Sequence, residues 1–146
     1  MKCLVFLSLL FTSMSVYSQA GTYIFHPQNT DGTIIKWTLN LNPDGTFLYH
    51  FLRNISPVSK VNREENIYCE GTWKLEGKLV IFDSDETEVI IKHKEGQTKH
   101  VLDFEGTKAR YITKSLRDTS DREVKTALWF YESKMFHIKG LKLYKQ

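Results

Sequence analysis

A tight turn between two strongly alternating segments is the feature that most constrains how this chain folds. In Asn42-Pro43-Asp44-Gly45, proline presets φ at the second turn position and glycine supplies a left-handed residue. Pairing Asn42 with Thr46 predicts three apolar rungs, Leu41 with Phe47, Leu39 with Tyr49, and Trp37 with Phe51. A slip of one residue would turn every side chain to the other face, so this register is strongly specified.

The same pattern of strand, turn and strand recurs twice. Around Glu76-Gly77-Lys78, a three-residue connection predicts Leu75 opposite Leu79 and Trp73 opposite Ile81. Farther along, a two-residue Gly96-Gln97 loop predicts a third hairpin with one apolar face. Its expected pairs are His93 with His100, Ile91 with Leu102, and Val89 with Phe104.

The last third of the chain carries a weaker pattern. We predict a strand over 108–113, a polar connection over 114–126 and a closing strand over 136–144. Ser120 to Glu123 has the form of a capping box, and helical spacing follows it through 131. A strand over Ala127 to Tyr131 is the alternative, and we favour the strand.

These segments predict an all-β protein. About 8–10 short antiparallel strands must hide their apolar faces, and closing the sheet both buries those faces and removes its edges. We therefore expect an antiparallel up-and-down β-barrel over 19–146, as a single domain, with at most one short helix near 120–131.

Two motifs resemble a known family. Leu39-Asn40-Leu41-Asn42-Pro43-Asp44-Gly45-Thr46-Phe47, followed by Gly71-Thr72-Trp73-Lys74-Leu75 and Leu79, is similar to the small secreted lipocalin-like domains of bacteria. The resemblance covers roughly residues 21–82. It implies a calycin-type barrel, which often holds a bound apolar molecule, and it implies no fixed set of functional residues.

The beginning of the chain has the pattern of a secretory signal peptide. Lys2 precedes a short apolar run, and small residues follow at Ser13, Ser15, Ser18 and Ala20. Cleavage after Ser18 is favoured over cleavage after Ala20, and an uncleaved anchor is the remaining alternative. Cys3 precedes the apolar run, so we do not expect a lipoprotein. The expected location is the periplasm or the extracellular space.

The composition limits the classes of partner that we expect for this protein. The chain has 20 basic and 17 acidic residues, and loss of Lys2 would leave a mild formal charge of about +2. No dense basic run indicates nucleic acid, and no second apolar segment approaches membrane length. Cys69 would be the one mature cysteine, so no internal disulfide is expected.

Loop lengths suggest where a ligand would enter. Connections of a meander alternate between the two ends, which places the turns at Pro43, Gly77 and Gly96 at one end. The longer loops 27–33, 54–66 and 83–86 share the other end, where 54–66 could act as a lid. The expected pocket lining is Trp37, Tyr49, Phe51, Cys69, Trp73, Val89 and Phe104. The alternative interpretation of these side chains is a filled core.

Other chemical sites have less support. His93 and His100 could share a metal ion across a hairpin, but no third ligand is evident. Cys69 lacks a readable base partner, and the carboxylates of 83–88 lack the order of a calcium loop. We see no catalytic motif and no cofactor motif, and expect a protein that is not an enzyme.

Two functions remain. The first is a binding protein for a small apolar or amphipathic ligand. The second is a filled barrel that acts through its surface, as an accessory or interaction module of the cell envelope with an unidentified protein partner.

Overall fold

The computed structural model describes residues 18–55, 63–93 and 96–146. All but the last residue of the expected signal peptide lies outside these residues, as does the centre of the expected lid. No helix in the described part is long and apolar enough to cross a membrane. Ten strands are described: β1 (Gly21–Phe25), β2 (Ile34–Leu41), β3 (Thr46–Asn54), β4 (Glu64–Glu76), β5 (Leu79–Asp83), β6 (Thr87–His93), β7 (Gly96–Leu102), β8 (Thr107–Ile112), β9 (Ala127–Glu132) and β10 (Lys142–Lys145).

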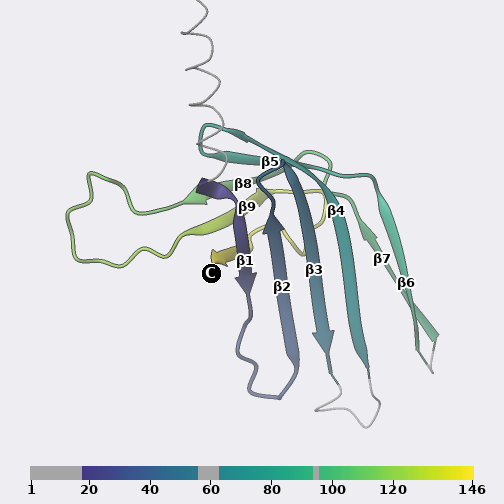
Figure 1. Ribbon diagram of the computed structural model, residues 1–146. Coiled ribbons are helices and arrows are strands. Elements are labelled where there is room, and N and C mark those ends of the chain that lie inside the picture. The colour runs from purple at the N-terminus through teal and green to yellow at the C-terminus, as the bar shows by residue number, and fades with distance from the viewer. Residues whose placement is uncertain (1–17, 56–62, 94–95) are drawn as a thin grey trace, which may run out of the picture.

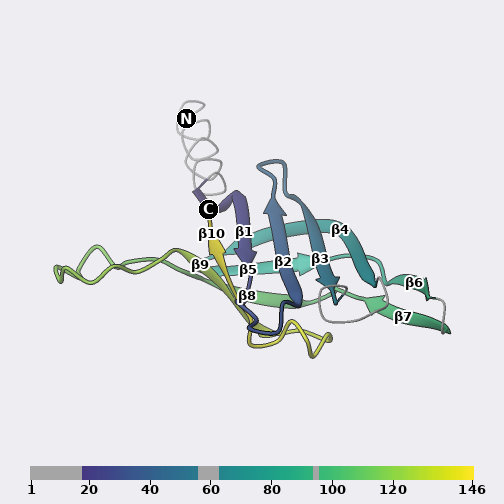
Figure 2. The ribbon, with the colours of Figure 1, turned by 90° about the horizontal axis from the view of Figure 1, so that it is seen from below.

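Eight of the described strands form a closed antiparallel barrel, which confirms the predicted fold class. Their order around the barrel is β1-β10-β9-β8-β5-β4-β3-β2, and β6 and β7 form a separate two-stranded sheet. This pair, which we call the arm, leaves the barrel between β5 and β8 and projects beside β4 (Figures 1 and 2).

The first hairpin has the predicted register. Leu41 lies opposite Phe47, Leu39 opposite Tyr49, and Trp37 opposite Phe51. The turn is closed by a 3.1 Å hydrogen bond that Gly45 N–H donates to the Asn42 carbonyl. Gly45 has a φ of +86°, the left-handed conformation expected of it.

The second hairpin differs from the prediction by one residue. Trp73 pairs with Phe82 and Leu75 with Val80, so the connection is only Gly77-Lys78. Gly77 has a φ of +63°, which suits the first loop position of a type II′ turn. The slip reverses the face of β5, because Val80 and Phe82 become fully buried in place of Leu79 and Ile81.

The predicted register of the third hairpin is wrong. Val89 pairs with His100, Ile91 with Thr98, and His93 with Gly96. Residues 94–95, between the two strands, lie outside the described residues. Phe104 belongs to neither strand of the arm and is buried in the barrel core. The shift totals four residues, an even number, so each side chain keeps its predicted face and the alternation could not reveal the error.

The C-terminal third is all strand and connection. Strand β8 matches the prediction over 108–113, and β9 confirms the strand interpretation of 127–131. No helix forms near 120–131 among the described residues. The closing strand is shorter than expected, because residues 133–141 turn back on β9 and only Lys142–Lys145 form a strand. Residues 142–144 of this strand pair with β9, and Tyr144 and Lys145 pair with β1.

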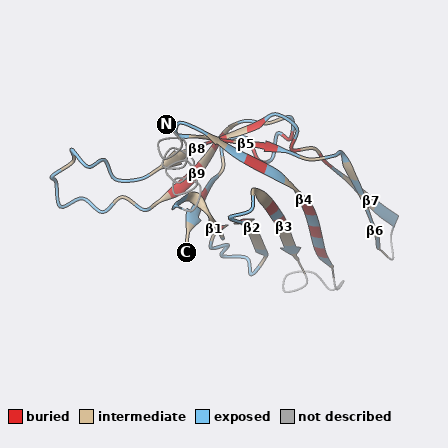
Figure 3. Ribbon diagram, turned by 45° about the horizontal axis from the view of Figure 1, so that its top comes forward, coloured by how far each residue is buried: buried red, intermediate tan, exposed pale blue. Residues whose placement is uncertain are grey.

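An aromatic cluster fills the barrel core. The Phe104 ring lies 5.0 Å from that of Phe47 and 5.1 Å from that of Tyr49, and the rings of Phe82 and Phe130 are 5.4 Å apart. Buried and exposed residues alternate along β4, as expected for a strand with one face inside (Figure 3). Side chains therefore fill this part of the barrel.

The barrel closes because β4 changes partner midway. Residues 64–72 of β4 pair with β3, whereas residues 72–76 pair with β5, and Thr72 pairs with both. The bend at this point requires glycine. A Cβ atom on Gly71 would lie 2.2 Å from the Asp83 carbonyl oxygen and 2.8 Å from the Phe47 ring.

Gly71→Ala should therefore destabilise the protein by about 2–3 kcal/mol, because the backbone of β5 must move to admit a methyl group. Gly77→Ala is the control, since its added Cβ meets nothing within 4 Å and costs only the left-handed φ, about 1 kcal/mol. Urea unfolding of both variants tests this. Equal losses would show that the contact with Asp83 does not set the bend.

Candidate functional site

A cavity of about 340 Å³ lies where the start of β2, the end of β3 and the start of β4 meet the arm and the 133–141 segment. We call it the aromatic cavity. Typical small-molecule sites have volumes of roughly 300–1,000 Å³. Its lining residues are Trp37, Tyr49, Phe51, Arg53, Glu65, Ile67, His100, Leu102, Phe136 and His137.

The cavity lies at the end of the barrel with the long connections. Successive connections of an antiparallel barrel alternate between its ends, so the turns at 42–45 and 77–78 share the opposite end. The Gly96 turn, expected there as well, belongs to the arm instead. Phe136 lines the cavity although the residue is 88% exposed, which locates the mouth beside it.

Three of the seven predicted lining residues meet at this cavity. Trp37 projects from β2, and Tyr49 and Phe51 come from β3. The rings of Trp37 and Phe51 are 5.3 Å apart, and Phe25 of β1 stacks on Trp37 at 5.5 Å. Two strands thus present a continuous aromatic wall.

The other four predicted residues lie elsewhere. Trp73 is buried near the opposite end, where its indole N–H donates a 3.0 Å hydrogen bond to the Asn42 carbonyl. Phe104 belongs to the filled core, and Val89 packs partly buried against it. Cys69 is buried with its sulfur 3.8 Å from Ser84 Oγ, and burial raises the pKa of its thiol. A protonated, buried thiol does not suit a nucleophile.

A buried carboxylate sits at the polar side of the cavity. Glu65 is only 1% exposed, and its Oε1 accepts a 3.1 Å hydrogen bond from Arg63 Nε. The Arg53 guanidinium lies 3.9 Å from its other oxygen, Oε2. Such a charge is tolerated inside a protein only when it is surrounded by compensating groups.

Both histidines that were considered as metal ligands face this carboxylate. His93 Nε2 lies 3.5 Å from Glu65 Oε1, and His100 Nε2 lies 3.7 Å from Oε2. They are not cross-strand partners, because His93 pairs with Gly96. The described residues contain no group of three side chains placed to hold a metal ion. The carboxylates of 83–88 are all exposed, and the residues between them, Ser84 and Thr87, are half-buried.

Four buried polar atoms in the described structure lack a hydrogen-bond partner, and all four belong to residues of the aromatic cavity. They are Trp37 Nε1, Tyr49 Oη, Glu65 Oε2 and His100 Nε2. Buried polar groups are nearly always satisfied, so a cluster of exceptions in one cavity requires an explanation. Burial, and to a lesser extent Cys69, raises the pKa of Tyr49, so its hydroxyl stays protonated and can donate.

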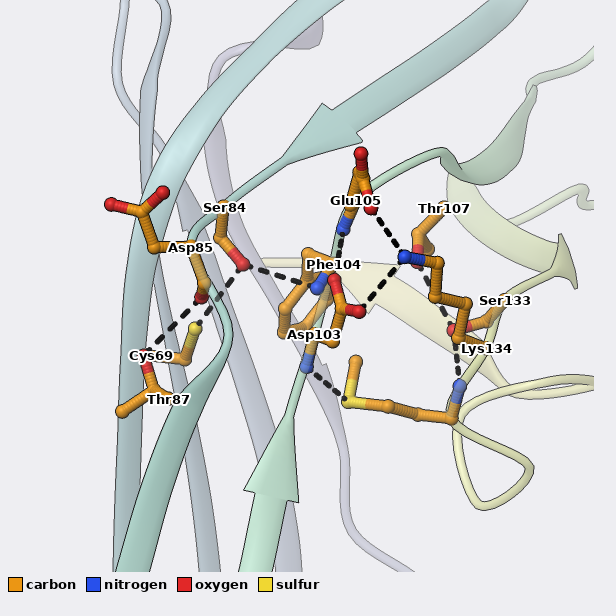
Figure 4. A network of polar contacts seen from close by, with 11 residues as sticks. Cys69, Ser84, Asp85, Thr87, Asp103, Phe104, Glu105, Thr107, Ser133 and Lys134 are labelled. Atoms are coloured by element: carbon orange, nitrogen blue, oxygen red, sulfur yellow. Dashed lines mark hydrogen bonds and ion pairs between the residues drawn. The ribbon is translucent and has the colours of Figure 1, made fainter.

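A network of polar contacts fastens the base of the arm to the 133–141 segment (Figure 4). Lys134 donates a 2.9 Å hydrogen bond to Asp103 and also pairs with Glu105. The bond from Lys134 lowers the pKa of Asp103. The Phe104 N–H donates to Ser84 Oγ at 3.1 Å. Because Leu102 and Phe136 flank these contacts in sequence, the network positions two walls of the cavity.

Sequence patterns did not predict several of the residues that line the cavity, although the sequence carries a signal for one of them, Glu65. Glu65 occupies an inward position of β4, two residues before Ile67 and four before Cys69, and a charge in such an alternation is unusual. Phe136 and His137 had no such signal, because a connection without strand periodicity brings them to the mouth. Partial burial, and then His100, lowers the pKa of His137.

The chain matches no family model, and no curated protein or solved structure is significantly similar to it.

Glu65→Gln should cost about 2–3 kcal/mol, because it leaves Arg63 and Arg53 without their buried countercharge. The matched change Glu76→Gln breaks an exposed pair with Lys74 and should cost less than about 0.5 kcal/mol. Chemical unfolding at neutral pH measures both. A loss for Glu65→Gln as small as that of the control would contradict the structural role given to this carboxylate.

Proposed function

We propose that this protein is an exported, lipocalin-like barrel of the calycin type that binds a small amphipathic molecule in the aromatic cavity. The lipocalin-like motifs in residues 39–47 and 71–79 and the signal-like first 18 residues support this assignment. The aromatic wall would hold the apolar part of the ligand, and the polar side would hold its hydrogen-bonding part.

The four buried polar atoms that lack a hydrogen-bond partner carry the proposal. An unsatisfied buried donor or acceptor costs roughly 1–3 kcal/mol, and proteins retain such groups where they serve another purpose. A filled core would have no reason to gather them in one place. A ligand that enters beside Phe136 could satisfy several of them at once.

A second candidate function is protein interaction through the arm. Its outer face carries Ile90 and Val101, which are 49% and 42% exposed, next to the paired charges of Glu88 and Lys99. Apolar side chains on a projecting ribbon suit contact with another protein. Failure of ligand binding together with reproducible crosslinking through the arm would favour this function.

Binding is tested first with a neutral fluorescent probe, phenylnaphthylamine, and with native mass spectrometry of protein purified from its own compartment. We expect saturable probe binding at one site per chain. A co-purified mass that leaves on denaturation would identify the natural ligand. No saturable binding and no retained mass would contradict the proposal.

Tyr49→Phe should weaken probe or ligand binding about three- to tenfold if the ligand bonds the hydroxyl, because one hydrogen bond contributes about 0.5–1.5 kcal/mol. Stability should not fall, since Tyr49 Oη has no partner in the protein. Titration and unfolding of the same sample measure both quantities.

Tyr23→Phe is the matched control. The Tyr23 hydroxyl donates a 2.6 Å hydrogen bond to the Gln19 carbonyl, so this change should cost about 1 kcal/mol of stability and leave binding intact. The opposite pattern, lost stability for Tyr49→Phe with unchanged affinity for the ligand recovered from the protein, would show that the hydroxyl serves the fold.

A further inference from the structure

The polar side of the aromatic cavity indicates which kind of ligand head group would fit there. Two of the four atoms without a hydrogen-bond partner, Glu65 Oε2 and His100 Nε2, lie 3.7 Å from each other. This separation is too long for a direct hydrogen bond. It does allow one further oxygen atom to lie about 2.7–2.9 Å from both.

The two atoms differ in what they require. An ionised carboxylate oxygen can only accept a hydrogen bond, whereas an imidazole nitrogen that carries its proton can only donate one. A group that fits between them must therefore donate and accept through the same atom. A hydroxyl group does this, because it has one O–H and two lone pairs.

The surrounding charges disfavour ions. A carboxylate head group would meet the negative charge of Glu65, which is itself buried. An ammonium head group would meet the guanidinium groups of Arg63 and Arg53, which lie 3.1 Å and 3.9 Å from the two Glu65 oxygens. The Glu65 carboxylate is already paired with both guanidinium groups, so a neutral head group avoids both repulsions.

We propose that the ligand of this cavity is a neutral alcohol or phenol, whose hydroxyl bridges Glu65 Oε2 and His100 Nε2 while its apolar body lies against Trp37 and Phe51. This inference rests on the proposed function and narrows it to one class of ligand. It sets the protein apart from a carrier of carboxylates such as fatty acids.

Three probes with the same ring system test the head group: naphthol, naphthalene and naphthoate, the first and last substituted at the same ring position. Equilibrium dialysis of each against the intact mature protein at neutral pH gives the dissociation constants. We expect naphthol to bind about tenfold more tightly than naphthalene, and naphthoate to bind more weakly than naphthol by at least as much.

His100→Leu tests the bridging atoms with little change in side-chain volume. It should reduce the preference for naphthol over naphthalene to about twofold while leaving naphthalene affinity within about twofold. Glu65→Gln should reduce the same ratio, provided that circular dichroism shows it to be folded. The Tyr23→Phe protein should keep the naphthol-to-naphthalene ratio of the unaltered protein, because the Tyr23 hydroxyl that it lacks bonds to Gln19, and neither residue lines the cavity.

The outcomes separate this inference from the proposed function. Equal affinity for naphthol and naphthalene would overturn the hydroxyl assignment and leave a binding cavity in place, with its polar side bridged by water. Tightest binding of naphthoate would overturn it in favour of an anion held by Arg53. No saturable binding of any probe, including phenylnaphthylamine, would overturn both.

Discussion

The structure depends on the change of partner along β4. Its C-terminal part, residues 72–76, forms a ladder with β5 and closes the barrel. Its N-terminal part, the lower part from Glu64 to Gly71, pairs only with β3 in the described structure. Side chains cover the second edge of this lower part in place of a strand. Arg63 reaches Thr98, and Glu65 faces His93 and His100, all of which belong to the arm. The aromatic cavity lies along this part of β4, and Glu65 and Ile67 line it.

This arrangement explains why polar groups gather at one end of an otherwise aromatic interior. The closed part of the barrel is filled mainly by the aromatic rings of Phe47, Phe82 and Phe104 and their apolar neighbours. Where the barrel opens, a carboxylate and several bases replace the strand that would have completed it. The same replacement leaves donors and acceptors with unused capacity, so the fold and the candidate site share a single origin.

Much of the fold could be predicted from the sequence, and the limits have clear physical reasons. The first hairpin could be registered because Pro43 and Gly45 fix its turn and a slip of one residue would expose its aromatic side chains. The arm could not, because a shift of four residues keeps every side chain on its face. Its separation from the barrel follows from the direct pairing of β5 with β8, a contact between segments far apart in the sequence.

The candidate site was predictable only in part. Trp37, Tyr49 and Phe51 could be placed together because they share one face of one well-registered hairpin. Glu65 was visible as a charge at an inward position, but its importance depends on Arg63, His93 and His100 arriving from other segments. Phe136 and His137 follow no periodicity, so tertiary structure alone brings them to the mouth.

Closure of the barrel removes exposed strand edges, and the arm introduces new ones. In the described structure, β6 and β7 pair only with each other, so each has one row of backbone N–H and C=O groups that no strand covers. Ile90 and Val101 are exposed on the same two strands, and Lys92 and Lys99 are charged residues of the kind that disfavours addition of another strand. Self-association at high protein concentration would therefore begin at the arm, and neutralising its lysines would promote it.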